Sequence, residues 1–200
     1  MENKPLILGI TGASGAPYAL EIVRKSMAMN LPLYVILSNA AREVMSHETG
    51  CKWEEWVEEL DPQAKLIHTA PVNEISHSLA SGSFCSRGMV IAPCSMGSLG
   101  RIASGISGNL LERAADVCLK ERRPLILMTR ETPLNRIHLE NMLKVNDAGG
   151  IILPPVPAFY SKPETVDDIV RSTVERVFML LNMDDSTSFR WNSFKEKIND

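Results

Sequence analysis

The residues best suited to chemistry lie in two loops of small side chains, each following a short apolar run. Leu6–Ile10 is followed by Thr-Gly-Ala-Ser-Gly at 11–15, and residues 89–92 are followed by Pro-Cys-Ser-Met-Gly-Ser-Leu-Gly at 93–100. Short apolar runs bounded by glycine are typical of buried strands. Loops of small residues that open a helix present backbone N–H groups and hydroxyls that can surround a phosphate. The two loops together predict a phosphorylated ligand at the carboxyl edge of a parallel sheet.

The spacing of these glycines narrows the choice of ligand. Gly9, Gly12 and Gly15 are three residues apart, so G-x-G-x-x-G is absent, and the second predicted strand ends at Ser38 rather than at an acidic residue that would bind a ribose. No Gly-Lys pair occurs, which excludes a P-loop. Flavin mononucleotide (FMN) fits, because its single phosphate needs one cradle and its ring one slot. For either loop alone, a tight turn that binds nothing remains an alternative.

Five further polar residues stand at positions where a ligand could reach them. Ser38 ends the second strand, where it could contact a ligand, although capping the next helix is the favoured interpretation. Glu48 lies at the end of that helix, where the helix dipole disfavours a carboxylate. Arg130 and Glu131 follow a strand directly, and Arg176 borders an apolar helical stripe formed by Val166, Ile169, Val170, Thr173, Val174 and Val177. Guanidinium groups suit phosphate, so both arginines are candidate ligands of an anion.

The elements that must position these residues alternate along the chain. Strands are predicted at 6–10, 33–37, 65–68, 89–92, 125–128 and 150–153, and helices at 16–29, 39–47, 53–60, 110–121, 135–146 and 165–181. This alternation predicts a single α/β domain with a three-layer, doubly wound parallel sheet of the flavodoxin or Rossmann type. The prolines of residues 154–157 predict a rigid extended loop at 154–160. We divide the chain into an FMN-binding domain at 1–183 and a polar tail with aromatic residues at 184–200, which we expect to dock on a neighbouring subunit.

Composition excludes several classes of function. The 200 residues carry a formal net charge of −3 without blocks of like charge, which argues against nucleic-acid binding. The apolar runs are too short to cross a bilayer, and the first residues do not read as a signal peptide. Four cysteines without paired spacing indicate reduced thiols in a cytoplasmic protein, and neither they nor the four histidines have metal-ligand spacing. We therefore expect no metal and no membrane contact. The G-x-S-x-G motif of serine hydrolases is also absent from the sequence, so serine hydrolysis has no support.

Several longer tracts carry a resemblance to a known family. They lie at residues 11–15, 93–99, 113–117, 119–123, 130–134, 138–139 and 154–160. From about Leu6 to Trp191 the chain resembles the UbiX-type flavin prenyltransferases, which were long called aromatic acid decarboxylases. The resemblance implies a flavodoxin-like homododecamer that binds reduced FMN and dimethylallyl monophosphate. It implies that the prenyl group is joined to flavin N5 and C6 without a metal, releasing phosphate, and that the prenylated FMN serves a UbiD-type decarboxylase.

The resemblance also assigns roles to residues. It implies that FMN is held by Gly12, Ala13, Ser14, Ser38, Ser95, Met96, Gly97, Ser98 and Arg130. It implies that the prenyl phosphate is bound by Arg113, Lys120, Glu131, Tyr160 and Arg176, with Trp191 completing the pocket. Ser14 and Glu48 are expected to assist proton movement near N5, Lys120 to offset the charge of the leaving phosphate, and Glu131 to share a proton with it. The hydroxyl of Ser98 stands where the family would have Thr.

Two rival functions use the same expected fold. A flavin-dependent peptidyl-cysteine decarboxylase would need a P-x-M-N-x-x-M-W tract near its catalytic histidine, whereas the comparable stretch here is His-Leu-Glu-Asn-Met-Leu at 138–143. A non-catalytic flavin carrier, or a subunit of an aromatic acid decarboxylase, would need the FMN loops only. Lys120, Glu131, Tyr160 and Arg176 would then have no purpose.

Overall fold

A six-stranded parallel sheet forms the centre of the computed structural model, which describes residues 4–183. The strands are β1 (Leu6–Ile10), β2 (Leu33–Leu37), β3 (Ile67–Ala70), β4 (Met89–Cys94), β5 (Leu125–Thr129) and β6 (Ile151–Ile152). The helices are α1 (Ala16–Ala28), α2 (Asn39–Thr49), α3 (Trp53–Leu60), α4 (Met96–Ala103), α5 (Leu110–Lys120), α6 (Arg136–Asp147) and α7 (Val166–Leu180). The predicted docking tail at 184–200, with Trp191, lies outside the described residues.

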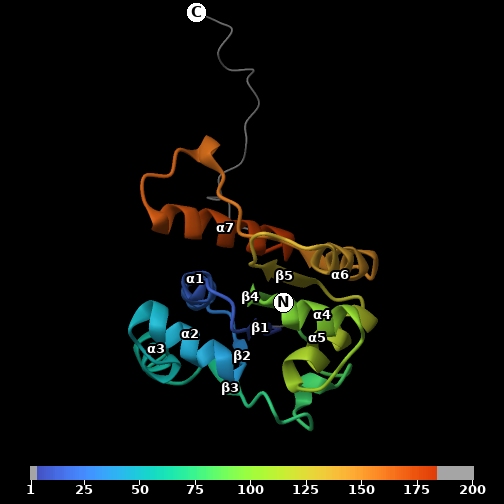
Figure 1. Cartoon of the computed structure of the whole chain (residues 1–200). Helices are drawn as coiled ribbons and strands as arrows, with labels where there is room; N and C mark the ends of the chain where they lie inside the picture. The colour runs from blue at the N-terminus through green and yellow to red at the C-terminus, as the bar shows by residue number, and fades with distance from the viewer. Residues whose placement is uncertain (1–3, 184–200) are drawn as a thin grey trace, which may run out of the picture.

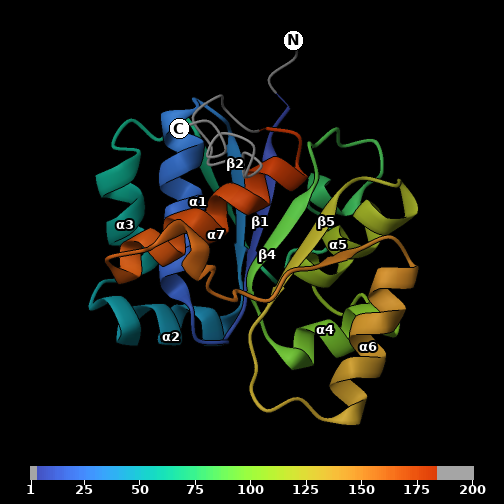
Figure 2. The same ribbon diagram turned by 90° about the horizontal axis from the view of Figure 1, so that it is seen from above.

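The strand order β3-β2-β1-β4-β5-β6 defines a doubly wound sheet with helices on both faces (Figures 1 and 2). One core cluster joins the sheet to α1 and α7, and a second joins the opposite face to α4 and α5. The direction of winding reverses between β1 and β4, and ligands of such sheets bind outside the carboxyl ends of the strands at that point. The predicted three-layer fold is confirmed, and it places both small-residue loops at the reversal.

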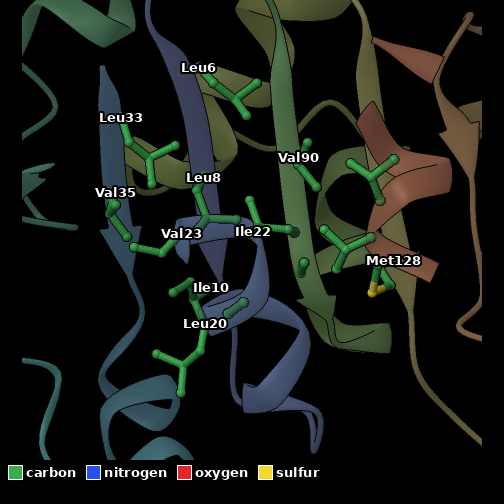
Figure 3. Close-up of a cluster of buried hydrophobic side chains, with 14 of the residues drawn as sticks. Leu6, Leu8, Ile10, Leu20, Ile22, Val23, Leu33, Val35, Val90 and Met128 are labelled. Atoms are coloured by element: carbon green, nitrogen blue, oxygen red, sulfur yellow. The ribbon is translucent and has the colours of Figure 1, made fainter. Parts of the chain in front are cut away.

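The continuous apolar runs form strands because both of their faces are buried. Leu6, Leu8 and Ile10 point into the first cluster, where Figure 3 shows them beside residues of α1, whereas Ile7 belongs to the second. All of β1 is buried, as expected for a parallel strand covered by helices on both sides. The bounds predicted for the first two strands and for the helix at 53–60 are confirmed.

The other predicted elements shift by one or two residues at their ends, and one helix was not predicted. The strand predicted at 65–68 lies at Ile67–Ala70, because the Asp61 carboxylate accepts hydrogen bonds from the backbone N–H groups of Lys65, Leu66 and Ile67 and holds this segment in a turn until the strand begins. The second small-residue tract, expected as a loop at 93–100, is not a loop throughout, since β4 runs to Cys94 and α4 begins at Met96. Two glycines lower its helix propensity, but its buried Leu99 and Ile102 stabilise it through packing.

Asp61→Asn should lower the free energy of unfolding by about 1–3 kcal/mol at pH 7, because charge-assisted bonds from backbone N–H groups to the carboxylate are lost. Asp61 is 8% exposed. Burial alone would raise its pKa, but the three N–H donors and the nearby His68 lower the pKa overall. A carboxyl with a depressed pKa stabilises the fold above its unfolded pKa of about 3.9, and this contribution disappears as the pH falls through the folded pKa. In denaturant titrations the difference between the variant and the wild type should therefore shrink as the pH falls below about 3.9.

Glu58→Gln removes an exposed carboxylate from α3 and provides the matched control for this comparison. It should change the free energy of unfolding by less than about 0.5 kcal/mol, as surface substitutions usually do. An equal loss in both variants would show that the hydrogen bonds of Asp61 do not stabilise the start of β3.

Candidate functional site

Four strand ends contribute polar groups at the carboxyl edge of the sheet. The loop at 11–15 follows β1, Ser38 follows β2, the tract beginning at Ser95 follows β4, and Arg130 follows β5. Strands β1, β2, β4 and β5 are neighbours in the sheet, so these groups surround the reversal point. The predicted FMN residues thus gather in one region although more than a hundred residues separate Gly12 from Arg130.

Two of the predicted serines are helix caps. The Ser38 hydroxyl accepts a hydrogen bond from the Ala41 N–H at 3.1 Å, which confirms the favoured interpretation of this residue. The Ser95 hydroxyl accepts from the Ser98 N–H at 3.3 Å and donates to the Ser98 hydroxyl at 3.1 Å. The first N–H groups of a helix have no acceptor within it, so the N–H groups of Met96 and Gly97 remain at the open end of α4.

Glu48 holds the beginning of α1. Its carboxylate accepts hydrogen bonds from the backbone N–H groups of Gly15, at 3.0 and 3.2 Å, and of Ala16, at 2.8 Å. Partial burial would raise the pKa of Glu48, but the Ser14 hydroxyl, the two N–H donors and the positive charge of Arg130 lower it overall. This carboxylate therefore occupies the position at the start of α1 where a phosphate was expected, which leaves α4 as the more open helix end.

Arg130 completes this group of residues. Its Nε donates a hydrogen bond to the Ser14 carbonyl oxygen at 3.2 Å. Ser14 thus contacts Arg130 through its backbone and Glu48 through its side chain. We name Ser14, Glu48 and Arg130 the edge cluster. It combines a hydroxyl, an ionised carboxylate and a guanidinium at the sheet reversal, and these are groups that can hold an anion and transfer a proton.

Gly12 in the first loop and Gly97 in the second differ in the space around them. A Cβ on Gly12 would lie 2.5 Å from the Cβ of Ala40, so the close approach of α2 requires glycine there. A Cβ on Gly97 would meet only the Arg101 guanidinium at 3.5 Å, and Gly97 is exposed. Gly12 is thus explained by packing alone, whereas Gly97 leaves the start of α4 open to a ligand.

The side chains expected to bind the prenyl phosphate do not meet in one chain. Arg113 and Lys120 lie on α5, which runs from the carboxyl edge to the amino edge of the sheet. The Arg113 side chain donates to the Ala80 carbonyl oxygen and pairs with Asp116, and Lys120 at the far end of the helix pairs with Glu121. Lys120 therefore lies at the edge opposite to the edge cluster.

Tyr160 and Arg176 share a separate cleft of about 260 Å³ between α7 and the proline-rich segment. Glu131 is exposed beside Arg130, and its side chain accepts a hydrogen bond from the Thr132 N–H. The apolar stripe predicted for α7 needs one correction. Val166 is 74% exposed, because it lies in the first turn before the helix reaches the core. Arg176, at the border of the stripe, is exposed.

The carboxyl edge fits a mononucleotide such as FMN. The Oγ1 atom of Thr129, at the end of β5, is buried and has no hydrogen-bond partner within residues 4–183. A buried hydroxyl without a partner is uncommon unless a ligand or water satisfies it. Together with Arg130 and the open end of α4, it supplies donors for phosphate and for ring or ribityl oxygens. Within the same range, no group of three or more His, Cys, Asp or Glu residues could hold a metal ion, and no helix is long and apolar enough to cross a membrane.

Two threonines contribute to this edge although the sequence analysis gave neither of them a role. Thr11 and Thr129 are both 2% exposed, and nothing in the spacing of the sequence marks either as a polar group at the reversal point. A threonine at the end of an apolar run was the available signal. Glu48 was a candidate from its position and from the resemblance, but its contact with the start of α1 joins residues more than thirty positions apart and was not predicted.

Fold and edge cluster together define a doubly wound domain that binds a mononucleotide at the sheet reversal. Comparison with known proteins agrees, because the family model described as Flavoprotein matches residues 1–178. The chain is 42% identical over 191 residues to a flavin prenyltransferase UbiX of Neisseria meningitidis serogroup B, covering 96% of this chain and 98% of that protein. The chain therefore belongs to the Flavoprotein family, and within it to the UbiX-type flavin prenyltransferases.

Solved structures show the same relationship. A structure of AnUbiX (PadA1) in complex with FMN and dimethylallyl pyrophosphate matches with a TM-score of 0.88 and 36% identity, covering 96% of this chain and 98% of that one. A dodecameric FMN-dependent UbiX-like decarboxylase from Escherichia coli O157:H7 matches with a TM-score of 0.86 and 38% identity, covering 94% of this chain and all of that one.

Proposed function

We propose that this protein is a flavin prenyltransferase that joins the dimethylallyl group of dimethylallyl monophosphate to N5 and C6 of reduced FMN and releases phosphate. The observation that carries the proposal is the end-to-end likeness to a structure solved with FMN and a prenyl donor. The edge cluster supports it, because it places an ionised carboxylate and a hydroxyl beside the expected flavin site. We also propose that the product serves a UbiD-type decarboxylase and that the protein is cytoplasmic, which suits its four free cysteines.

FMN would be held at the sheet reversal by the two loops. The Met96 and Gly97 N–H groups and the Arg130 guanidinium would meet its phosphate and polar edges, and Thr129 would gain a hydrogen-bond partner. When bound, the reduced flavin supplies the two ring atoms that take up the prenyl carbons. Glu48 and Ser14 would assist proton movement at the flavin edge: the Ser14 hydroxyl would relay the proton, and the Glu48 carboxylate, which its lowered pKa keeps ionised, would accept a hydrogen bond from that hydroxyl and orient it.

The prenyl donor requires cations elsewhere in the site. When the allylic C–O bond breaks, its electron pair leaves with the phosphate, and fixed positive charges must offset the developing charge. Arg176, Lys120 and Arg113 would supply them, with Glu131 sharing a proton with the phosphate. The aromatic ring of Tyr160, and that of Trp191 outside the described residues, would shield the allylic cation.

These residues can serve one site only if several copies of the chain contribute. Lys120 lies at the sheet edge opposite to Ser14, so the Lys120 that serves a given site would come from another subunit. Exposed apolar side chains on α6 provide surface for such contacts, with Ile137 67%, Leu139 53% and Leu143 58% exposed. Apolar clusters of this kind on a surface often mark interfaces. A homododecamer like that of the Escherichia coli relative is the assembly that we propose.

The direct test is incubation of the protein with chemically reduced FMN and dimethylallyl monophosphate, followed by mass spectrometry of the extracted flavin. We expect the flavin to gain one C5H8 unit and inorganic phosphate to be released in equal amount. A control without the prenyl donor should return unmodified FMN. If the protein binds FMN but neither product forms, the chain acts as a flavin carrier or decarboxylase subunit, and the proposed function is wrong.

A further inference from the structure

Thr11 is a buried polar residue to which the proposed reaction assigns no role. It follows β1 directly and is 2% exposed. Its hydroxyl donates a hydrogen bond to the Pro93 carbonyl oxygen at 2.8 Å and accepts one from the Ser95 N–H, also at 2.8 Å. Its own backbone N–H donates to the same Pro93 oxygen at 3.2 Å. Three hydrogen bonds therefore join one residue of the first loop to the beginning of the second.

These bonds lie where the sheet no longer determines the distance between the two loops. The regular pairing of β1 with β4 ends at Gly9 and Ile91. The pairing of β4 with β5 shifts register between Ile91 and Cys94. Beyond the last regular β1–β4 pair, the hydrogen bonds of Thr11 continue the contact between the two strands, so they set the distance between the two loops.

Hydrogen bonds connect Thr11 to the start of the second loop, and other hydrogen bonds fix the far end of the first loop. Ser95, which Thr11 holds through its N–H, caps α4 by accepting from the Ser98 N–H. At the other end of the first loop, the Glu48 carboxylate holds the N–H groups of Gly15 and Ala16. The first loop is thus fixed at both ends, and the open end of α4 is fixed relative to it.

The side chain at this position must both donate and accept. Valine has nearly the same shape as threonine but would leave the Ser95 N–H and one bond of the Pro93 carbonyl unmade at a largely buried site, and such groups cost free energy. Serine retains the hydroxyl and both hydrogen bonds. The requirement is therefore for the hydroxyl rather than for volume.

We infer that Thr11 is a positioning residue, which sets the distance between the two FMN loops so that one nucleotide can contact both. The inference rests on the proposed FMN site. Its test uses oxidised FMN binding, so it can fail or succeed independently of prenyl transfer.

The test compares Thr11→Val and Thr11→Ser in titrations of the intact oligomer with oxidised FMN, followed by flavin fluorescence and absorbance. We expect Thr11→Val to raise the Kd by about tenfold or more, equivalent to one lost hydrogen-bonding group. Thr11→Ser should stay within about threefold of the wild type. At saturating FMN, the KM for dimethylallyl monophosphate should be unchanged in both variants, because Thr11 does not contact the expected prenyl site.

Thr69→Val is the matched control. The Thr69 hydroxyl accepts from the indole N–H of Trp53 at 2.9 Å on β3, so this variant also loses a threonine hydrogen bond, but away from the two loops. It should lower the melting temperature and leave the Kd for FMN unchanged. If Thr11→Val does not fold, Thr11→Cys replaces it, because a thiol of similar volume bonds only weakly. We expect it to raise the Kd by at least threefold.

The inference is wrong if folded Thr11→Val, or Thr11→Cys in its place, binds oxidised FMN as tightly as the wild type. It is also wrong if Thr11→Ser fails as badly as Thr11→Val, because the methyl group would then be the feature that matters. A wild-type protein that binds FMN but makes no prenylated flavin would refute the proposed function and leave this test intact.

Discussion

Arg176→Gln is expected to reduce prenyl transfer by about 100-fold or more while leaving the Kd for oxidised FMN within about twofold of the wild type. A fixed donor aimed at developing charge is typically worth 10²–10³ in rate, and glutamine cannot replace a guanidinium at a phosphate. Arg176 and Tyr160 line the same cleft, and no residue of the edge cluster lines it. Loss of Arg176 should therefore affect the donor half of the site only, as a rise in KM for dimethylallyl monophosphate with a fall in kcat.

Arg171→Gln on the same helix is the matched control. Arg171 is exposed and lines a different surface, between α1 and α7, together with Arg24 and Asp167. It should leave both prenyl transfer and FMN binding near the wild-type values. Full activity of Arg176→Gln would remove Arg176 from the prenyl site, and equal losses in both arginine variants would point to a general effect of charge.

Glu48→Gln is expected to lower kcat for prenyl transfer by about 100-fold, the lower range for a lost proton-transfer group. Glutamine has the size of glutamate and one carbonyl oxygen that can still accept from the start of α1, so the fold should persist. Its neutral amide has no negative charge to orient the Ser14 hydroxyl and cannot take part in proton transfer through it. Steady-state rates with reduced FMN, together with the Kd for oxidised FMN, separate loss of proton transfer from loss of binding.

The pH dependence of stability provides a second readout for Glu48. Its pKa is lowered, so the ionised carboxylate stabilises the fold above the unfolded pKa of about 4.3, and this contribution is lost as the pH falls through the folded pKa. The variant should therefore differ most from the wild type at neutral pH and least below about pH 4.

Glu43→Gln, an exposed carboxylate on the same helix, should change neither the rate nor the pH profile. If Glu48→Gln lost FMN binding in proportion to its rate, Glu48 would be an anchor of α1 and not a proton carrier.

Local chemistry made much of the fold predictable. The apolar runs at β1 and β2 could only be buried strands, and Ser38 could be recognised as a cap from its place before a helix. Helix α4 was missed because glycine lowers helix propensity while the packing that compensates for it involves residues distant in sequence. The strand β3 was displaced for a similar reason, since Asp61 holds its approach through bonds that the sequence pattern does not reveal.

The candidate site was predictable in part. Spacing alone located the two loops, the positions of Glu48 and Arg176 on their helices made both residues candidates, and the resemblance added Lys120. The contact between Glu48 and Ala16 depends on how α2 packs beside the first loop, which the sequence does not specify. The separation of Lys120 from Ser14 depends on the direction of α5 across the sheet. Trp191 remains a prediction, because it lies outside the described residues.

The placement of Lys120 and Ser14 at opposite edges of the sheet has a genetic consequence. If both residues serve the reaction as proposed, the Lys120 and the Ser14 of one polypeptide belong to two different active sites of the oligomer. Two alleles, one defective at each edge, would then restore some intact centres when their products assemble together. Loss of function in this protein would accordingly follow the rules of complementation within a gene rather than those of an independent monomer.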